Sequence, residues 1–421
     1  MVSPTGPAID RQSSPSSQDV LLSTSPPDGG YGWVCVIAIF FINCFTWGAV
    51  SSYGVYLENY LSDEYFPEAQ PMDYAFIGGL IFAMAMLVAP LVTIISRKYS
   101  TKVPMFLGIA LLAIGYVTAS FAQRIWQLYL SQGVAVGVGL GFTYIPSIPI
   151  VSQWFDKKRS LANGICSAGS GIGGLIFSFM ADAVIRNVSL GWALRLTAIV
   201  SCSVLLIATV VIRDRNSVIQ PTQRGFDAQL LRQPQVMLLL AWAFISILGY
   251  MTLLFSLPDF ARSIGLSRTQ AATTNAVLNL GTAVGRPVIG IMSDRCGRIE
   301  VAGIVTLVCG LSCFAIWLPA ESYGVLLLFS IISGGMLGVF WVTIGPLCAE
   351  IADLKDLQSL LSLSWLSTIL PAAFSEVIGL KLRRPNSGRE YLYAQIYSGL
   401  AYICASAFMF GLWIHRRRGT S

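Results

Sequence analysis

The sequence predicts an all-α membrane protein with about twelve transmembrane helices, arranged as two bundles of six. Three observations lead to this fold class. Hydrophobic residues make up 55% of the 421 residues and charged residues only 11%, well below the charged share of soluble proteins. Apolar runs long enough to cross a bilayer recur along the chain. One long polar interruption divides these runs into six and six.

The apolar runs predict twelve spans, each near the roughly 20 residues that a helix needs to cross the hydrocarbon core. Glycine and proline occur within several runs, which membrane helices tolerate because neighbouring helices satisfy the freed backbone groups. We expect kinks near Pro146–Pro149 and Gly334–Pro346. The expected spans are 33–57, 74–96, 103–122, 126–150, 161–184, 192–212, 236–257, 270–293, 301–319, 322–347, 358–381 and 392–414.

The chain divides at the polar interruption. Its first residues are rich in Ser, Pro, Thr and Gln, a composition that cannot bury enough apolar surface to fold. They also lack the basic start and apolar core of a signal peptide. The predicted organisation is a disordered cytoplasmic tail at 1–30, a six-helix bundle at 31–212, a cytoplasmic central loop at 213–235, a six-helix bundle at 236–414 and a short basic cytoplasmic tail at 415–421.

Positive charge predicts the orientation. With the N-terminus in the cytoplasm, most of the 27 Lys and Arg residues fall on the inner side, as the positive-inside rule requires. The segment 58–73, on the outer side, has five acidic residues and no Lys or Arg. We therefore expect a multi-pass membrane protein with both termini cytoplasmic. Its expected location is the cell membrane, with a vacuolar or other internal membrane as the alternative, and we expect it to function as a monomer. Cytoplasmic anchoring explains the net charge of +6, so the lipid bilayer is a partner and nucleic acid is not.

Several function classes are excluded by the composition. The nine cysteines are scattered singly, and the one histidine, His415, lies beyond the last span, so we expect no metal site, no cofactor and no enzymatic chemistry. The glycine-rich run 168–174 has no preceding strand and no Lys-Ser/Thr, which favours close helix packing over nucleotide binding. No Walker motif occurs, so transport would not be driven by ATP.

The segment 290–298 resembles the loop motif of major facilitator proteins, G-x-x-x-D-R-x-G-R. Its aspartate can accept hydrogen bonds from a neighbouring helix terminus or an arginine, while its arginines pair across the bundle. Such contacts can hold one conformation closed and break in the other. The alternative is an ordinary positively charged inner loop. The predicted gating residues are Gly290, Asp294, Arg295, Gly297 and Arg298.

A second motif lies at the entrance to span one. It resembles the D-G-G-[WY]-G-W signature of the monocarboxylate transporter family, and its residues are Asp28, Gly29, Gly30, Tyr31, Gly32 and Trp33. The segment 154–164 and Arg286-Pro287 also resemble that family, and 345–382 is similar to its fungal branch. The similarity covers nearly all of the chain from Pro26 onward. It implies a secondary transporter of organic solutes that works by alternating access, related to proteins found beside secondary-metabolite pathways.

Arg286 is the residue that we expect to bind substrate. A guanidinium deep in a span is costly unless it faces a cavity or a partner. The family resemblance implies that it holds a carboxylate, which an arginine can do with two parallel hydrogen bonds. The alternative is a structural ion pair with Glu350, Asp353 or Glu376.

The chain departs from the family at two positions. Members that couple small acids to protons have a lysine late in span one, where this chain has Ser51, and an aspartate one turn before the arginine, where it has Thr282. The sequence therefore favours a larger or planar solute. Asparagines in the spans can line its cavity and aromatic rings can stack on it, although packing or lipid anchoring is the alternative for any one ring. These additional candidates are Asn43, Tyr53, Tyr144, Asn275, Asn279, Trp341 and Trp365.

Glu376, with Asp182 as the second candidate, is the predicted group for proton coupling, because both carboxyl groups fall within the expected spans. The alternative is that either lies at the outer interface. The predicted function is secondary active or facilitative transport of a monocarboxylate-like organic anion or planar metabolite, with protons as a possible second partner. Two alternatives remain: an exporter of a fungal secondary metabolite, and a nutrient sensor on the same fold. A sensor usually adds a long cytoplasmic signalling tail, and the short segment after span twelve favours transport.

Overall fold

A computed structural model describes residues 25–62, 66–384 and 387–419, and every regular element within these ranges is a helix. Residues 1–24, most of the expected disordered tail, lie outside the described residues. Within the described ranges, twelve helical segments are long and apolar enough to cross a membrane. The predicted number of spans is therefore confirmed.

The first six spans form one bundle. Their helices are α2 (Gly32–Phe45), α3 (Trp47–Ser51) and α4 (Tyr53–Ser62) in span one; α5 (Pro71–Leu87) and α6 (Ala89–Lys98) in span two; α7 (Lys102–Ala119) in span three; α8 (Ile125–Leu128), a π-helix (Tyr129–Ala135), α9 (Val136–Tyr144), a 3-10 turn (Ile145–Ser147) and α10 (Ile148–Trp154) in span four; α11 (Arg159–Asn187) in span five; and α12 (Leu190–Val211) in span six.

The last six spans form the second bundle, after a short helix α13 (Asn216–Ile219) and a 3-10 turn (Leu230–Arg232). Their helices are α14 (Pro234–Ser263), α15 (Arg268–Cys296), α16 (Arg298–Ser312) continued by a π-helix (Cys313–Trp317), α17 (Tyr323–Leu337) and α18 (Val339–Ile351) in span ten, α19 (Leu357–Ser367) and α20 (Ile369–Leu382) in span eleven, and α21 (Leu392–Gly419).

Several spans are broken near their middle. Span four changes to a 3-10 turn at Ile145–Ser147, where Pro146 removes a backbone donor. Span ten is interrupted at Gly338, whereas Pro346 stays inside α18, so the second expected kink lies earlier than the proline. Span one is interrupted at Thr46 and Ser52. Such breaks turn side chains onto new faces of a span.

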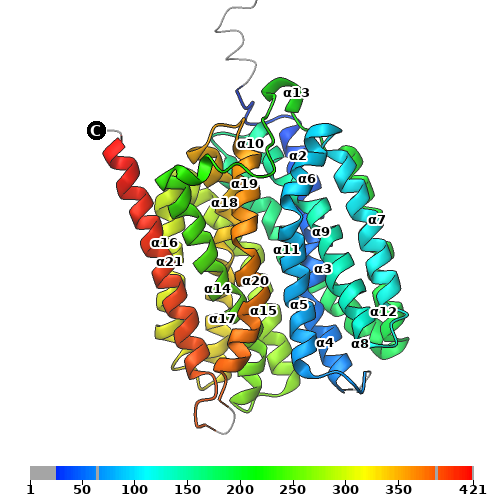
Figure 1. Cartoon of the computed structure of the whole chain (residues 1–421). Coiled ribbons are helices and arrows are strands. Elements are labelled where there is room, and N and C mark those ends of the chain that lie inside the picture. The colour runs from blue at the N-terminus through cyan, green and yellow to red at the C-terminus, as the bar shows by residue number, and fades with distance from the viewer. Residues whose placement is uncertain (1–24, 63–65, 385–386, 420–421) are drawn as a thin grey trace, which may run out of the picture.

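The two bundles stand side by side, with α11 and α15 in contact along one seam and α5 and α20 along another (Figure 1). We call the end where α2 begins and α21 ends the proximal face, and the opposite end the distal face. Large apolar side chains such as Phe179, Ile207 and Val210 are exposed on the outer surfaces of the helices. This is the arrangement expected where lipid replaces water as the solvent.

The segment between the bundles crosses the proximal face and is held by both. Gln153 of α10 donates to Asn216, while the side chains of Gln223 and Gln358 are hydrogen bonded at 2.9 Å. At the second expected tail, α21 continues as helix through Gly419. Its basic end is stabilised by an ion pair between Arg416 and Glu350.

Candidate functional site

The seam between α11 and α15 brings the predicted functional residues together. Its helices approach so closely that a Cβ atom at Gly164 would lie 2.5 Å from the carbonyl oxygen of Arg286. Small residues allow this contact, as is usual between helices in lipid, where close packing replaces the hydrophobic effect as the driving force. Gly171, in the glycine-rich run 168–174 of α11, is equally close to α15, because a Cβ atom there would lie 2.6 Å from the carbonyl oxygen of Asn279.

Arg286 lies in the middle of this seam and is only 5% exposed. Its Nη1 donates to the carbonyl oxygen of Ser167 and to Oγ of Ser170, each at 2.6 Å, so the guanidinium reaches from α15 to α11. Its Nε has no acceptor. The break at Gly338 leaves room for the guanidinium, because a Cβ atom there would lie 2.5 Å from Nε.

The structural ion pair considered for Arg286 is not formed with either acid whose side chain is described. Glu350 pairs with Arg416 at the proximal face, and Asp353 is exposed. The side chain of Glu376, which lies in α20, is outside the described part of the structure. The positive charge of Arg286 is thus balanced, among the described residues, only by neutral oxygen atoms.

Aromatic rings from both bundles surround this position. We call Trp47, Tyr144, Tyr250, Trp341 and Trp365 the interface aromatic cluster. Trp47 of the first bundle contacts Trp341 of the second, with ring centroids 5.2 Å apart, and Trp341 stacks on Trp365 at 5.9 Å. Tyr144 and Tyr250 are close enough to Arg286 to interact with its charge. The cluster is therefore continuous across the interface.

Four of the additional substrate candidates fall on the seam or in the cluster. Tyr144, Trp341 and Trp365 belong to the cluster and are buried. Asn279 lies on α15 seven residues before Arg286, which is two helical turns, and its Oδ1 faces Gly174 of α11. Asn275 has no described hydrogen bond.

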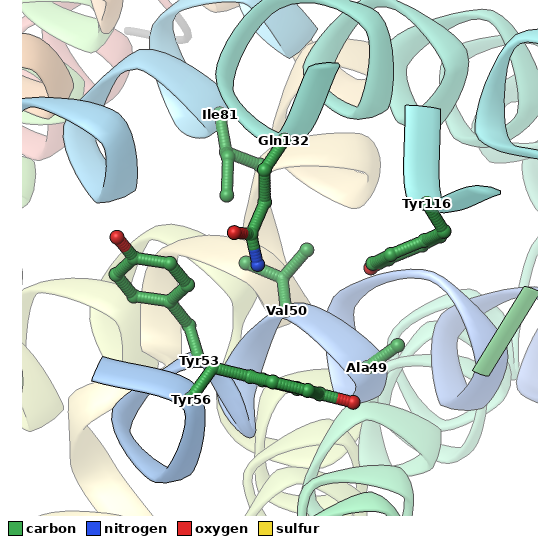
Figure 2. Close-up of a pocket in the computed structure, with 7 residues that line it drawn as sticks. All are labelled: Ala49, Val50, Tyr53, Tyr56, Ile81, Tyr116 and Gln132. Carbon is green, nitrogen blue, oxygen red and sulfur yellow. The ribbon is translucent and has the colours of Figure 1, made fainter. Parts of the chain in front are cut away.

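Asn43 and Tyr53 form their described hydrogen bonds within the first bundle. The amide of Asn43 donates to the carbonyl of Ile39, one turn earlier in its own helix. Tyr53 donates to the carbonyl of Tyr74 and lines a cavity of about 10 Å³ inside the first bundle, with Gln132 on its other side (Figure 2). That volume suits about one water molecule and no organic solute. The break at Ser52 directs Tyr53 to this cavity, which the sequence pattern did not predict.

The gating motif closes the proximal end of the seam. Asp294 accepts hydrogen bonds from the backbone N–H groups of Ser160 at 2.9 Å and Leu161 at 2.8 Å, in the first turn of α11. Arg298 lies 3.6 Å from Asp294 and donates to the carbonyl oxygen of Asp156 at 2.6 Å. The contacts of Asp294 with Ser160 and Leu161, and the contact of Arg298 with Asp156, join the second bundle to the first.

The other motif residues have separate roles. Gly290 packs against the carbonyl oxygen of Ser160, so a side chain there would separate the helices. Gly297 has a φ of 100°, a conformation that favours glycine, and connects α15 to α16. Arg295 is exposed and forms none of the described cross-bundle contacts. Of the two arginines predicted to pair across the bundle, Arg298 does so.

The signature at the start of span one docks on the loop before α11. Oδ1 of Asp28 accepts from the backbone N–H groups of Asp156 at 2.8 Å and Lys157 at 2.9 Å. Trp33 packs edge-on against Phe155, with ring centroids 4.9 Å apart. The two segments that resemble one family in sequence are therefore in direct contact in space. Among the remaining signature residues, Gly29, Gly30 and Tyr31 form the turn that leads into α2, and Gly32 is the first residue of that helix.

Asp182 lies away from the seam. It is near the distal end of α11, where its half-exposed side chain pairs with Arg186 at 2.8 Å. An ion pair with this exposure contributes little to stability and is open to solvent. Among the described residues no group of three or more His, Cys, Asp or Glu side chains is arranged to hold a metal ion.

Sequence reasoning missed Trp47, Tyr250, Ser167, Ser170 and Gly338. Neither the two aromatic residues nor the serines differ in pattern from the many others in the spans, so composition alone could not select them. Only Gly338 carries a signal: it lies in the stretch Gly334–Pro346, where a kink was expected.

Comparison with known proteins agrees with this architecture. The sequence profile of the Major Facilitator Superfamily matches residues 36–354 and 239–419. A protein of Saccharomyces cerevisiae named "Probable transporter MCH2" is 34% identical over 391 residues, which cover 91% of this chain and 83% of that protein. The "Fujikurins efflux protein" of Gibberella fujikuroi is 27% identical over 409 residues, covering 96% of this chain and 87% of the relative.

The fold is also similar to solved structures. The proton:xylose symporter XylE, bound to 6-bromo-6-deoxy-D-glucose, superposes with a TM-score of 0.74 over 90% of this chain and 95% of that one. Its sequence identity of 12% limits the comparison to the fold.

Proposed function

The chain belongs to the Major Facilitator Superfamily and is a multi-pass transmembrane transporter, and we propose that it carries an organic anion or planar metabolite through a site centred on Arg286. One observation supports this proposal above the others. Arg286 is buried between the bundles, it has no ion-pair partner among the described side chains, and its Nε lacks an acceptor. A buried charge in this state favours an anionic ligand that completes its hydrogen bonds.

Alternating access would follow from the arrangement of the seam. The described hydrogen bonds between the bundles lie at the proximal face and around Arg286, through Asp294, Arg298, Asn163 and Arg286 itself. When these contacts break, the bundles can rock apart and expose the guanidinium on the proximal side. A carboxylate that replaces the contact of Arg286 with Ser167 and Ser170 would couple binding to this movement.

We assign the chain to the fungal branch of the monocarboxylate transporter family. The contact between Asp28 and the loop at Asp156 and Lys157 supports this assignment, because it gives two of the family-like segments a common structural role. Ser51 and Thr282 replace the charged residues of the proton-coupled members, and Thr282 bonds to the carbonyl oxygens of Leu278 and Gly334 instead. The cargo is therefore proposed to differ from small monocarboxylates.

The proximal face is proposed to be cytoplasmic, in the cell membrane. Basic residues gather there and flank the ends of the spans, as the positive-inside rule describes for cytoplasmic loops. They include Lys98, Lys157, Lys158, Arg213 and Arg416. Export of a metabolite is a second candidate direction, favoured by the similarity to an efflux protein.

The test combines cargo identification with substitution of Arg286. Untargeted metabolite profiling of cells and medium, with and without the gene, would identify the solute and the direction of its movement. Flux of that solute into proteoliposomes is then measured for Arg286→Gln and Arg286→Lys. Loss of a charge-assisted hydrogen bond predicts a fall in kcat/KM of about 10-fold or more for Gln, with partial retention for Lys.

A matched control is Arg195→Gln. Arg195 also lies within a span, but it bonds to Ser120 and packs on Phe121 at the distal end of the first bundle. Its substitution is expected to leave flux unchanged. Normal flux in Arg286→Gln, at equal protein abundance, would remove Arg286 from the site.

A further inference from the structure

Three indole N–H groups of the interface aromatic cluster are buried without an acceptor. They belong to Trp47, Trp341 and Trp365, and the Nε of the nearby Arg286 shares this property. The side chain of Tyr250 is close enough to Arg286 and Trp341 to interact with both. However, Nε of Arg286 and the indole nitrogen of Trp341 each lack an acceptor with hydrogen-bonding geometry. A buried donor left unsatisfied destabilises the protein, so a group of such donors at one place calls for an explanation.

The chemistry of these groups is one-sided. An indole N–H donates and cannot accept, and a guanidinium likewise has donors alone. The three indole N–H groups and Nε of Arg286 therefore need acceptor atoms, which the carbonyl or carboxylate oxygens of a ligand supply. The rings themselves offer flat apolar faces, and Trp341 and Trp365 are already stacked within 19° of parallel. Aromatic faces bind flat, conjugated partners in the same offset geometry.

We infer that the cargo is a flat, conjugated anion that carries several hydrogen-bond acceptors on its ring edge, such as ring carbonyl oxygens. This inference rests on the proposed function and specifies its substrate class. The anionic group pairs with Arg286, the ring stacks on Trp341 or Trp365, and the edge acceptors take the indole N–H groups. Trp47 contacts Trp341 across the interface, so the ligand enters between these rings when the bundles part.

The cluster is distinct from ordinary burial of tryptophan in this protein. Trp242, also fully buried, donates to Thr306 at 3.2 Å within the second bundle. Trp317 is buried with an unpaired N–H, but it stacks on Phe329 in a separate hydrophobic core of the second bundle. Trp317 therefore provides a control that has the same buried donor outside the interface.

The test uses two probes of the same shape. Anthraquinone-2-carboxylate and anthracene-2-carboxylate both have three fused rings and one carboxylate, but only the former carries two ring carbonyl oxygens. Binding to the full chain in lipid nanodiscs is measured by equilibrium dialysis against empty nanodiscs. We expect the affinity for the quinone to be at least about 10-fold higher than the affinity for the anthracene, because the carbonyl oxygens of the quinone accept hydrogen bonds from the buried donors.

The variants Trp47→Phe, Trp341→Phe and Trp365→Phe keep an aromatic face and remove one donor each. At least one is expected to reduce the preference for the quinone about 5-fold or more without weakening anthracene-2-carboxylate, while Trp317→Phe preserves the preference. Equal binding of the two probes, binding of neither, or a preference that all three variants retain overturns the inference.

Arg286→Gln separates this inference from the proposed function. It should weaken both carboxylates by the same factor and leave their ratio unchanged. A normal ratio with no effect of Arg286→Gln contradicts the anion site but keeps the acceptor-rich cargo. If Arg286→Gln abolishes binding of both probes, but the wild-type protein binds the two probes equally, the anion site is supported and the acceptor-rich cargo is contradicted.

Discussion

Asp294 caps a helix that belongs to the opposite bundle: its carboxylate accepts the N–H of Ser160 in the first turn of α11. The N-cap residue of α11, Lys158, provides no side-chain hydrogen bond. The first N–H groups of a helix have no partner within it, and an anion near them is stabilised by the helix dipole. The start of α11 is therefore fully capped only while the proximal ends of α11 and α15 are together.

Asp294→Asn is expected to loosen this closure. The amide offers one oxygen acceptor in place of two and lacks the charge that interacts with the helix dipole. We expect hydrogen exchange of the Ser160 and Leu161 amides to become about 10-fold faster, because hydrogen bonds to charged groups are worth about 1.5–3 kcal/mol. Substrate flux should fall in the same variant.

Asp182→Asn is the control for the exchange measurement, since Asp182 lies on α11, as Ser160 and Leu161 do, in a half-exposed pair with Arg186. The exchange of the Ser160 and Leu161 amides in this variant should match the wild type. If Asp294→Asn also exchanged and turned over normally, the aspartate would not act as a gate.

Gly164→Ala is expected to push the two bundles apart. The added Cβ atom would lie 2.5 Å from the carbonyl oxygen of Arg286, and a backbone atom cannot move aside without moving α15. Spin labels at Lys157 and Arg295, both exposed at the proximal face, would report a longer distance between the bundles. The measurement requires a background in which the native cysteines are replaced.

Gly324→Ala provides the comparison, because no heavy atom lies within 4 Å of the position of its Cβ. The label distance should be unchanged in this variant. An unchanged distance in Gly164→Ala would mean that the seam adapts locally and that close contact at this glycine does not set the conformation.

The spans were predictable because their hydrophobic length is a local property of the chain. The bilayer sets that length, so twelve spans follow from twelve apolar runs without knowledge of the packing. The contact between Asp294 and a helix terminus was also predictable in kind, since a buried carboxylate requires donors. Its gating role stays a prediction.

The site could be predicted only in part, because it depends on how the spans are broken. Tyr53 and Trp47 lie six residues apart in span one, on either side of the break at Ser52, and they face different surroundings. A regular helical pattern cannot follow side chains through such a break. Arg286 was selected because a charge in a span is rare, whereas Tyr250 has no comparable signal in the sequence.

Gly338→Ala is expected to weaken substrate binding without unfolding the protein. The new methyl group would lie 2.5 Å from Nε and 2.9 Å from Nη2 of Arg286, so the guanidinium must move. We expect KM for the identified solute to rise about 10-fold, as in a partial loss of the Arg286 contact. The effect should be non-additive with Arg286→Gln, because both changes act on one group.

Gly335→Ala tests whether the effect is specific to the guanidinium. Gly335 lies three residues earlier, and the nearest atoms to its Cβ position are 3.7 Å away, an ordinary contact. It should have near-normal KM. Full additivity of Gly338→Ala and Arg286→Gln would show that Gly338 acts elsewhere.

Asp28→Ala is expected to reduce thermal stability, because it removes the acceptor for the N–H groups of Asp156 and Lys157. Asp28 has a φ of 53°, a left-handed conformation that asparagine also adopts readily, whereas alanine does so at a cost. Asp28→Asn therefore changes the charge alone and should have the smaller effect. A loss of about 1–3 kcal/mol predicts a fall in Tm of several degrees for Ala, measured by intrinsic fluorescence in detergent.

The exposed Asp353, changed to Ala, serves as the control for Asp28→Ala. If Asp28→Ala and Asp353→Ala unfolded at the same temperature, docking of the signature on the loop before α11 would contribute nothing to stability.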